Sequence, residues 1–453
     1  MSGIAEVLVN LGYRVSGSDL VSNTATRRLK RLGAEIHRGH DESQIHGADA
    51  VVISSAVRED NPEVEEARRL KIPVIPRAEM LAELMRMKHG VAVAGAHGKT
   101  TTTGMIAEVL TRGKLDPTVI IGGRVGKLRS GAKLGRGEIM VAEADESDGS
   151  FLRMNPTIAV VTNIDREHLD HYGDLERIRL AFRRFISRVP FYGAAIVCND
   201  EPNVREILSD FDRKLITFGF DENSDVRAVD VEFSGFTSVF TVRNREAALG
   251  RVELGLAGRH QVCNALAAVA VGLELDVPFP TIAAALGKFR GVDRRMQLRG
   301  EAAGAKIIDD YGHHPTEIEA TLTAVREGFD ARVVVIFQPH RYSRSRALLD
   351  EFGRAFSLAD SVWVTDIYAA GEQPIAGLDG STVAESIVRS GHPSVVYEPQ
   401  VKQIASRLLP ELRPGDIVLT LGAGDVWKVG ESLIRAASRG GGAGTVDCKR
   451  RSA

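Results

Sequence analysis

The ten residues from Gly95 to Gly104, GAHGKTTTTG, constrain the fold of this chain more than any other segment. They follow the short apolar run Val91–Ala94 and precede a segment whose apolar residues recur with a helical period. A glycine-rich turn between a strand and a helix presents backbone N–H groups that bind anions such as phosphate. The common phosphate loop is G-x-x-x-x-G-K-[ST], whereas this loop has a shorter glycine spacing and contains His97. The sequence therefore predicts an α/β fold with a phosphate loop of unusual spacing.

The residue types of this loop predict a nucleotide-phosphate site with a magnesium ion. Lys99 is expected to reach the β- and γ-phosphates, and the Thr100 hydroxyl is expected to coordinate Mg²⁺. The alternative is a glycine-rich turn with a chance Gly-Lys-Thr, and the flanking strand and helix patterns argue against it. The loop residues predicted to bind the nucleotide, which the family resemblance given below implies is ATP, are Gly95, Ala96, His97, Gly98, Lys99, Thr100 and Thr101.

Composition limits the classes of protein to which the chain can belong. Its 453 residues suggest several domains, and a net charge of −2 provides no basic field for nucleic acid or an anionic membrane. The three cysteines share no C-x-x-C spacing, which argues against a zinc site and fits a reducing compartment. We find no apolar run long enough for a membrane span and no signal-peptide pattern. We expect a cytoplasmic enzyme with no nucleic-acid or membrane partner. The cysteines are Cys198, Cys263 and Cys448.

Strand-like and helix-like segments alternate in three blocks, which predicts mostly parallel sheets. The blocks are residues 1–89, 90–295 and 296–438, and residues 439–453 are expected to be a disordered tail. A β-rich insert is expected over about residues 215–256. Expected helices are Thr26–Leu32, Pro62–Leu70 and Val262–Leu273. Expected strands are Tyr13–Gly17, Ala50–Ile53, Val91–Ala94, Glu138–Ala142, Ile158–Thr162, Lys306–Asp309, Arg332–Phe337, Val362–Thr365 and Asp416–Leu421.

Polar side chains follow two further strands of the second block. Glu143 is the first acid of EADESD, directly after an apolar run, and Asp165 and His168 follow the strand Ile158–Thr162. Taken singly, these could be a solvated acidic turn and a structural histidine. Ligands of open α/β sheets, however, bind at the carboxyl edge of the strands, where these groups and the phosphate loop converge. The sequence therefore predicts Thr100, Glu143 and His168 as metal ligands.

The third block delivers aromatic, imidazole and guanidinium groups at the ends of two strands. DDYGHHP begins at Asp309, and QPHRYSR begins at Gln338. Because arginine binds carboxylates and phosphates through two parallel hydrogen bonds, these segments predict an anion site. The alternative reading is a pair of helix N-termini with polar caps.

Together these motifs resemble the Mur ligase family of peptidoglycan synthesis. GAHGKTTT, EADESD, TNIDREHLD and GRHQVCNALAA resemble the family's ATPase domain, and DDYGHHPTEI and QPHRYSRSR resemble its L-alanine-adding branch. The resemblance extends from Met1 to about Ala437. It implies three α/β domains: a Rossmann-like UDP-sugar domain, a central P-loop ATPase domain and a C-terminal doubly wound Rossmann-like domain. It also implies a monomer or a homodimer.

The resemblance further implies a reaction and a set of site residues. ATP phosphorylates the lactyl carboxylate of UDP-N-acetylmuramate, and L-alanine attacks the acyl phosphate. Lys99, His168 and Arg344 are the implied catalytic residues, with one Mg²⁺ on Thr100 and Glu143 and a second near His168. Implied nucleotide contacts are His260, Asn264, Arg295 and Asp310, and implied substrate contacts are Ser18, Asp19, Tyr311, His313, His340, Arg341 and Arg344.

The chain departs from the family pattern at two places. No lysine lies between His168 and Pro190, so the carbamylated lysine of several family members is not assigned. The family's first strand and its glycine loop would precede Met1. We therefore expect the natural protein to begin about 15 to 25 residues upstream, which is the length of one strand with its turn and a short leader. The alternative is a genuine short form of the protein.

Two other functions stay open. One is a recycling ligase that attaches a whole tripeptide to the same nucleotide sugar, and the other is a non-catalytic sensor of a UDP-sugar or ATP. The segment QPHRYSRSR favours the alanine ligase over the recycling ligase. A ligase is favoured over a sensor by Lys99, Glu143 and His168.

Overall fold

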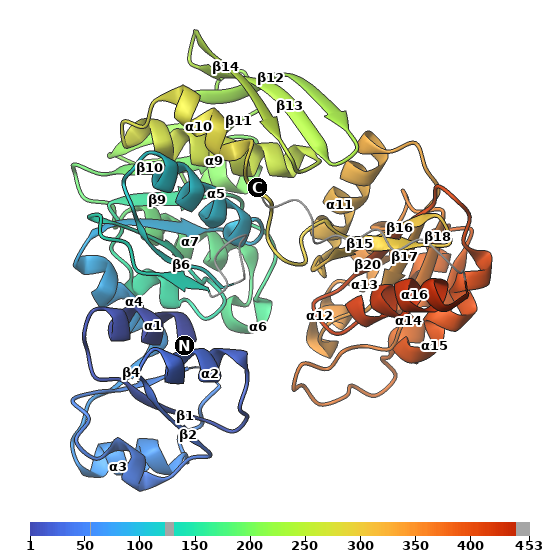
Figure 1. Cartoon of the computed structure of the whole chain (residues 1–453). Coiled ribbons are helices and arrows are strands. Elements are labelled where there is room, and N and C mark those ends of the chain that lie inside the picture. Colours follow the sequence, from blue (N-terminus) through green and yellow to red (C-terminus); the bar gives the residue numbers. More distant parts are fainter. Residues whose placement is uncertain (55, 123–130, 441–453) are drawn as a thin grey trace. The chain divides into compact units, whose positions relative to one another are not determined.

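The computed structural model describes residues 1–54, 56–122 and 131–440 and divides into two compact units (Figure 1). The first comprises Met1–Glu232, Val239–Gly255 and His260–Val292, and the second comprises Phe233–Ser238, Leu256–Arg259 and the chain from Asp293. All of the first predicted block and most of the second therefore lie in one unit. Residues 441–453 of the predicted tail lie outside the described residues, and helix α16 (Trp427–Gly440) covers the tail's first two residues.

The first block forms two parallel pairs of strands, β1 with β2 and β3 with β4, as two separate two-stranded sheets. The strand predicted at Tyr13–Gly17 is displaced: Gly12, with a φ of +91°, follows helix α1, and pairing begins only at Ser16. The elements are α1 (Ser2–Asn10), β1 (Ser16–Asp19), α2 (Thr24–Arg31), β2 (Glu35–Arg38), η1 (Glu42–Ile45), β3 (Val51–Ile53), α3 (Pro62–Arg69), β4 (Val74–Pro76) and α4 (Arg77–Arg86).

The second block is built on a ten-stranded sheet of order β14-β13-β12-β11-β10-β9-β5-β8-β6-β7. Strand β5 lies between β9 and β8, parallel to both, so three carboxyl ends meet at one edge. The strands are β5 (His89–Ala94), β6 (Thr118–Ile120), β7 (Ala132–Lys133), β8 (Ile139–Glu143), β9 (Ile158–Val161), β10 (Ala194–Cys198), β11 (Lys214–Gly219), β12 (Val226–Ser234), β13 (Thr237–Asn244) and β14 (Ala247–Leu254). The helices are α5 (Lys99–Arg112), η2 (Ser150–Arg153), α6 (Leu169–Tyr172), α7 (Leu175–Ile186), α8 (Pro202–Glu206), α9 (Arg259–Glu274) and α10 (Phe279–Leu286).

Helix α5 packs behind the phosphate loop. Met105, Ile106, Val109 and Leu110, which share the predicted apolar face, are all fully buried. Thr102 and Thr103 are buried as well, so the helix is enclosed over more than one face. Such burial fixes the start of α5, and with it Lys99, against the central strands.

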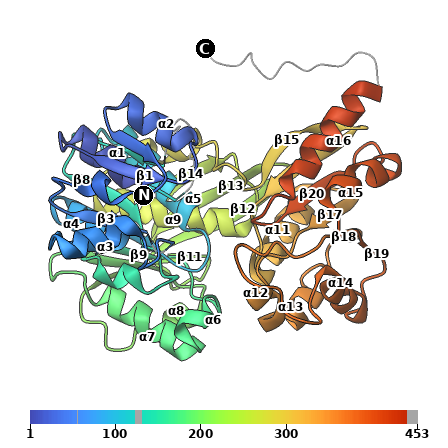
Figure 2. The ribbon, with the colours of Figure 1, turned by 90° about the horizontal axis from the view of Figure 1, so that it is seen from below.

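The third block is a doubly wound six-stranded sheet of order β15-β16-β20-β17-β18-β19, parallel except for the edge strand β15. Alternate residues of β17 join two cores: Val333, Val335 and Phe337 face one, and Val334 and Ile336 face the other. Figure 2 shows α15 and α16 on one side of this sheet and α12 and α13 on the other. The elements are β15 (Gln297–Ala302), β16 (Ala305–Asp310), α11 (Pro315–Gly328), β17 (Val333–Phe337), α12 (Tyr342–Ala347), α13 (Leu349–Arg354), β18 (Ser361–Val364), α14 (Gly380–Arg389), β19 (Val395–Tyr397), α15 (Val401–Leu408), η3 (Leu409–Glu411), β20 (Ile417–Leu421) and α16.

Among the described residues, no helix is both long enough and apolar enough to cross a bilayer.

Candidate active site

The phosphate loop, Gly95–Lys99, joins the buried strand β5 to helix α5. Gly95 has a φ of +143°, and a Cβ there would lie 2.0 Å from Oγ1 of Thr162. Gly98 has a φ of +82°, and a Cβ there would lie 2.5 Å from Oδ1 of Asn264. Both positions therefore require glycine, which explains the Gly-x-x-Gly spacing of this loop. Thr162 also donates a hydrogen bond to the His97 carbonyl at 2.7 Å, so the end of β9 holds the loop in place.

Lys99 is tied to its own loop and to a buried carboxylate. Its Nζ donates to the Gly95 carbonyl at 2.6 Å and to the Ala96 carbonyl at 3.1 Å. The same atom forms an ion pair with Glu146 at 2.7 Å, and that carboxylate is 4% exposed. Burial, the largest single effect, lowers the pKa of Lys99, but Glu146, with smaller contributions from Glu167 and Asp145, raises it and the net pKa is raised. The lysine is therefore positively charged at the mouth of the phosphate loop.

Glu143 lies at the end of β8, beside the first turn of α5. Its Oε2 accepts a hydrogen bond from the Gly122 N–H at 3.0 Å, and its Oε1 is buried with no hydrogen-bond partner among the described residues. Burial raises the pKa of Glu143, although the nearby Thr100 hydroxyl and Gly122 N–H oppose this shift. The structure thus places Thr100 and Glu143, two of the predicted metal ligands, next to each other.

His168, the third predicted metal ligand, belongs to a cluster that the sequence did not reveal in full. Ligand atoms of Glu146, Glu167 and His168 all lie within 4.8 Å of one another. His168 has a left-handed backbone, with a φ of 55°, and its Nε2 lies 3.6 Å from Glu146 and 3.5 Å from Glu167. Oε2 of Glu146 is buried with no hydrogen-bond partner among the described residues.

The donor set around the phosphate loop fits a hard divalent cation. Unpartnered buried carboxylate oxygens are costly, and Glu143 and Glu146 each present one here. Mg²⁺ prefers carboxylate and hydroxyl oxygens, which Glu143, Glu146 and Thr100 supply. Sequence reasoning missed Glu146 and Glu167 as members of the site. Glu146 lies in the EADESD motif, but its contact with Lys99 joins residues 47 positions apart, and no local pattern indicates such a contact.

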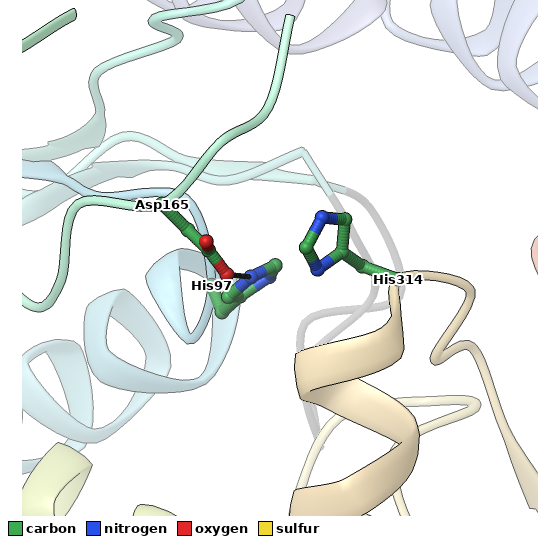
Figure 3. Close-up of side chains that lie close together, drawn as sticks. All are labelled: His97, Asp165 and His314. Carbon is green, nitrogen blue, oxygen red and sulfur yellow. Dashed lines mark hydrogen bonds and ion pairs between the residues drawn. The ribbon is translucent and has the colours of Figure 1, made fainter. Parts of the chain in front are cut away.

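His97 of the loop is paired within the first unit. Its Nε2 lies 3.1 Å from Oδ2 of Asp165, the acid that follows β9 (Figure 3). Its backbone N–H donates to Asn163 Oδ1 at 2.7 Å. Figure 3 also draws His314, which belongs to the second unit.

Helix α9 brings Asn264 to the loop. Asn264 Oδ1 accepts a hydrogen bond from the Thr102 hydroxyl at 3.1 Å, and its Nδ2 donates to Gln261 at 3.3 Å. The Gln261 side chain in turn contacts Nε2 of His260 at 3.0 Å. The two predicted nucleotide contacts on this helix, His260 and Asn264, are therefore linked through Gln261.

In the second unit, a basic and aromatic group surrounds the end of β16. The guanidinium groups of Arg294 and Arg295 lie 5.0 Å and 5.3 Å from the centre of the Tyr311 ring. Arg295 also pairs with Glu317 at 3.0 Å. Burial raises the pKa of Asp310 to about 6, although its carboxylate accepts two backbone N–H groups.

The predicted substrate residues of the second unit also come together. The rings of Tyr311 and His313 lie 5.4 Å apart, and those of His313 and His340 lie 5.5 Å apart. Nη1 of Arg344 lies 3.5 Å from Nδ1 of His340, and Arg341 pairs with Glu372 at 3.2 Å. Burial, together with the charges of His313 and the two arginines, lowers the pKa of His340 to about 4. Strands β16 and β17 thus deliver one imidazole- and guanidinium-rich group.

The first block contributes a cavity that the sequence did not predict. A cavity of about 330 Å³ is lined by residues of this block, among them Arg58, Arg68 and Arg77, and by Asp145, Asp148 and Ser150 after β8. Arg77 lies 3.9 Å from Asp145. The predicted substrate residues Ser18 and Asp19 lie at the end of β1, and neither of them lines this cavity. The Ser18 hydroxyl contacts His40 at 2.9 Å, and the Asp19 carboxylate accepts a hydrogen bond from the Val21 N–H.

The chain belongs to the Mur ligase family. The sequence patterns called "Mur ligase family, catalytic domain", "Mur ligase middle domain" and "Mur ligase, glutamate ligase domain" match residues 1–89, 93–272 and 294–424. This family membership and the α/β fold confirm the resemblance found in the sequence.

Its relatives include proteins named UDP-N-acetylmuramate–L-alanine ligase. The one from Desulfatibacillum aliphaticivorans is 52% identical over 97% of this chain and 96% of its own length. The one from Myxococcus xanthus is 54% identical over 96% and 92%. Among solved structures, the UDP-N-acetylmuramate–alanine ligase of Thermotoga maritima matches with a TM-score of 0.80 and 28% identity, covering 97% of each chain.

Proposed function

We propose that this protein is an ATP-dependent ligase that joins L-alanine to the lactyl carboxylate of UDP-N-acetylmuramate through an acyl phosphate, in peptidoglycan precursor synthesis. The observation that carries the proposal is the identity of 52–54% with proteins named for this activity, over nearly the whole of both chains. The phosphate loop, the buried carboxylates and the arginine group of the second unit support it chemically.

The phosphate loop supplies the groups that phosphoryl transfer needs. The backbone N–H groups at the start of α5 are available to the phosphate oxygens, and the Lys99 ammonium offsets negative charge on the transferring group. Lys99 must exchange its bonds to the Gly95 and Ala96 carbonyls for bonds to phosphate. Thr100, Glu143 and His168, with Glu146, would hold Mg²⁺, which supplies further neutralisation of the phosphates when bound.

The cavity of the first unit suits the nucleotide sugar. Its lining carries Arg58, Arg68 and Arg77 together with the acids Glu59, Asp145 and Asp148, and guanidinium groups are suited to a pyrophosphate or a carboxylate. Asp145, Asp148 and Ser150, which also line the cavity, follow the strand that carries Glu143.

The second unit provides the groups for the amino acid. Arg341 and Arg344 are suited to the carboxylate of L-alanine, since guanidinium groups bind carboxylates in a bidentate fashion. His340 stays neutral near pH 7 because its pKa is lowered to about 4, so it adds no positive charge beside the two arginines.

An acceptor competition tests this proposal. The full chain is incubated with ATP, Mg²⁺, UDP-N-acetylmuramate and equal amounts of L-alanine and L-Ala-γ-D-Glu-meso-diaminopimelate, and the products are separated by mass. The proposal expects the alanyl product. The tripeptide product alone would identify a recycling ligase, as in a Neisseria relative of 29% identity named for that reaction. Absence of both products would favour a sensor.

A further inference from the structure

A second group of ligand atoms lies in the first unit, apart from the carboxylates described above. The sulfur atoms of Cys198 and Cys263 and a carboxylate oxygen of Asp200 all lie within 4.8 Å of one another. Cys198 ends β10 and is 2% exposed, Asp200 follows it, and Cys263 projects from α9 and is half-buried. The sequence argued against a zinc site because these cysteines lie 65 residues apart, and only the fold joins them.

The Asp200 carboxylate is held in place by backbone groups. The N–H of Phe220 lies 2.9 Å and 2.8 Å from its two oxygens, and the N–H of Asp221 donates to Oδ1 at 2.9 Å. Gly219 makes this approach possible, since its φ is +155° and a Cβ there would lie 2.5 Å from Oδ1. Carboxylates that ligate metals are oriented by such outer hydrogen bonds.

The spacing of the ligand atoms matches a tetrahedral metal site. Bonds of about 2.3 Å to sulfur and 2.1 Å to oxygen at a tetrahedral angle place the two ligand atoms about 3.6 Å apart. The sulfur of Cys263 lies 3.7 Å from Oδ2 of Asp200. The Cys198 sulfur lies within 4.8 Å of both atoms, and a tetrahedral site places the two sulfur atoms about 3.8 Å apart.

We infer that Cys198, Asp200 and Cys263 form a site for one thiophilic divalent ion such as Zn²⁺, with water as the fourth ligand. Two thiolates and a carboxylate select such an ion over Mg²⁺, which prefers oxygen alone. Both thiols lose their protons as the ion binds. The bound ion ties the end of β10 to α9 at the residue before Asn264, whose side chain contacts Thr102 behind the phosphate loop.

Cobalt binding tests the site, because Co²⁺ replaces Zn²⁺ and reports its ligands. The reduced full chain is used as Cys448→Ser, so that only Cys198 and Cys263 remain as thiols. Titration should give one Co²⁺ with a thiolate-to-metal charge-transfer band in the near ultraviolet and the visible bands of tetrahedral cobalt. Absence of the charge-transfer band would overturn the inference. Excess Mg²⁺ should leave the band intact, and its disappearance would also count against the site.

Variants then identify the ligands. Cys263→Ser should abolish the charge-transfer band or weaken binding at least tenfold, and Asp200→Asn should weaken binding at least tenfold. Because Cys263 is half-buried, its serine variant should retain the fold, and circular dichroism checks this. Zn²⁺ should raise the unfolding temperature of the parent and leave that of Cys263→Ser unchanged. An unaltered cobalt spectrum in Cys263→Ser, or an equal zinc effect on both proteins, would refute the assignment.

Discussion

The pair of Lys99 and Glu146 makes Lys99→Ala a test of structure as well as of catalysis. The substitution leaves the Glu146 carboxylate, 4% exposed, without its cation. Removing one partner of a buried pair costs about 3–5 kcal/mol. Because the Lys99 side chain is still 19% exposed, we expect the low end, about 3 kcal/mol, in the first unit. Turnover should also fall at least about 100-fold, which corresponds to about 2.7 kcal/mol of barrier.

Hydrogen exchange is the assay for the stability part of this prediction. Both tryptophans, Trp363 and Trp427, lie in the second unit, so their fluorescence does not report on the loop. Exchange of buried amides in β5 and β9 measures the opening free energy there. The double variant Lys99→Ala/Glu146→Ala should regain most of the lost stability, because no unpaired carboxylate remains.

A surface pair provides the matched control. Lys133 pairs with Asp116 at 2.8 Å, but their side chains are 34% and 44% exposed. Lys133→Ala should therefore cost less than about 1 kcal/mol. If Lys99→Ala is as stable as Lys133→Ala, or if the double variant is less stable than Lys99→Ala, the buried-pair reasoning is wrong.

Three further predictions concern the metal, the amino acid and the pH dependence. Glu143→Ala should raise the Mg²⁺ concentration for half-maximal phosphate release at least about tenfold, since one hard ligand is lost; an unchanged Mg²⁺ titration would count against the ligand role. Arg344→Ala should raise the KM for L-alanine at least about tenfold through loss of a charged hydrogen bond, while the KM for ATP stays constant; the reverse pattern in steady-state kinetics would contradict the acceptor role. The pKa of His340 is lowered to about 4 in the folded chain and is about 6.5 when unfolded, so its contribution to stability is complete above pH 6.5 and is lost as the pH falls toward 4. An NMR titration of the His340 ring with a midpoint near 6.5 would refute this environment.

Local patterns predicted the strands that position the site, because buried strands of a parallel sheet are apolar throughout. The expected runs Val91–Ala94 and Ile158–Thr162 correspond to β5 and β9 within two residues. Edge strand β15, QLRGEA, was missed because it is polar and contains an irregular register at Gly300.

Sequence reasoning selected site residues by their place at or after the end of a strand. Glu143, at the end of β8, and His168, in the segment after β9, were selected in that way, and their roles as metal ligands stay predictions. The pairing of Lys99 with Glu146 and the Cys198–Asp200–Cys263 group were not predicted, because each joins segments far apart in sequence and no local pattern encodes such contacts. The roles assigned to Arg341 and Arg344 stay predictions.

The most direct test of the central claim follows one oxygen atom. UDP-N-acetylmuramate is labelled with ¹⁸O in both oxygens of its lactyl carboxylate and turned over with ATP and L-alanine by the full chain. If the carboxylate attacks the γ-phosphate and the amine then displaces phosphate, the released phosphate carries one ¹⁸O per turnover and the new amide carries the other. Unlabelled phosphate, released while the alanyl product forms, would contradict the acyl-phosphate mechanism.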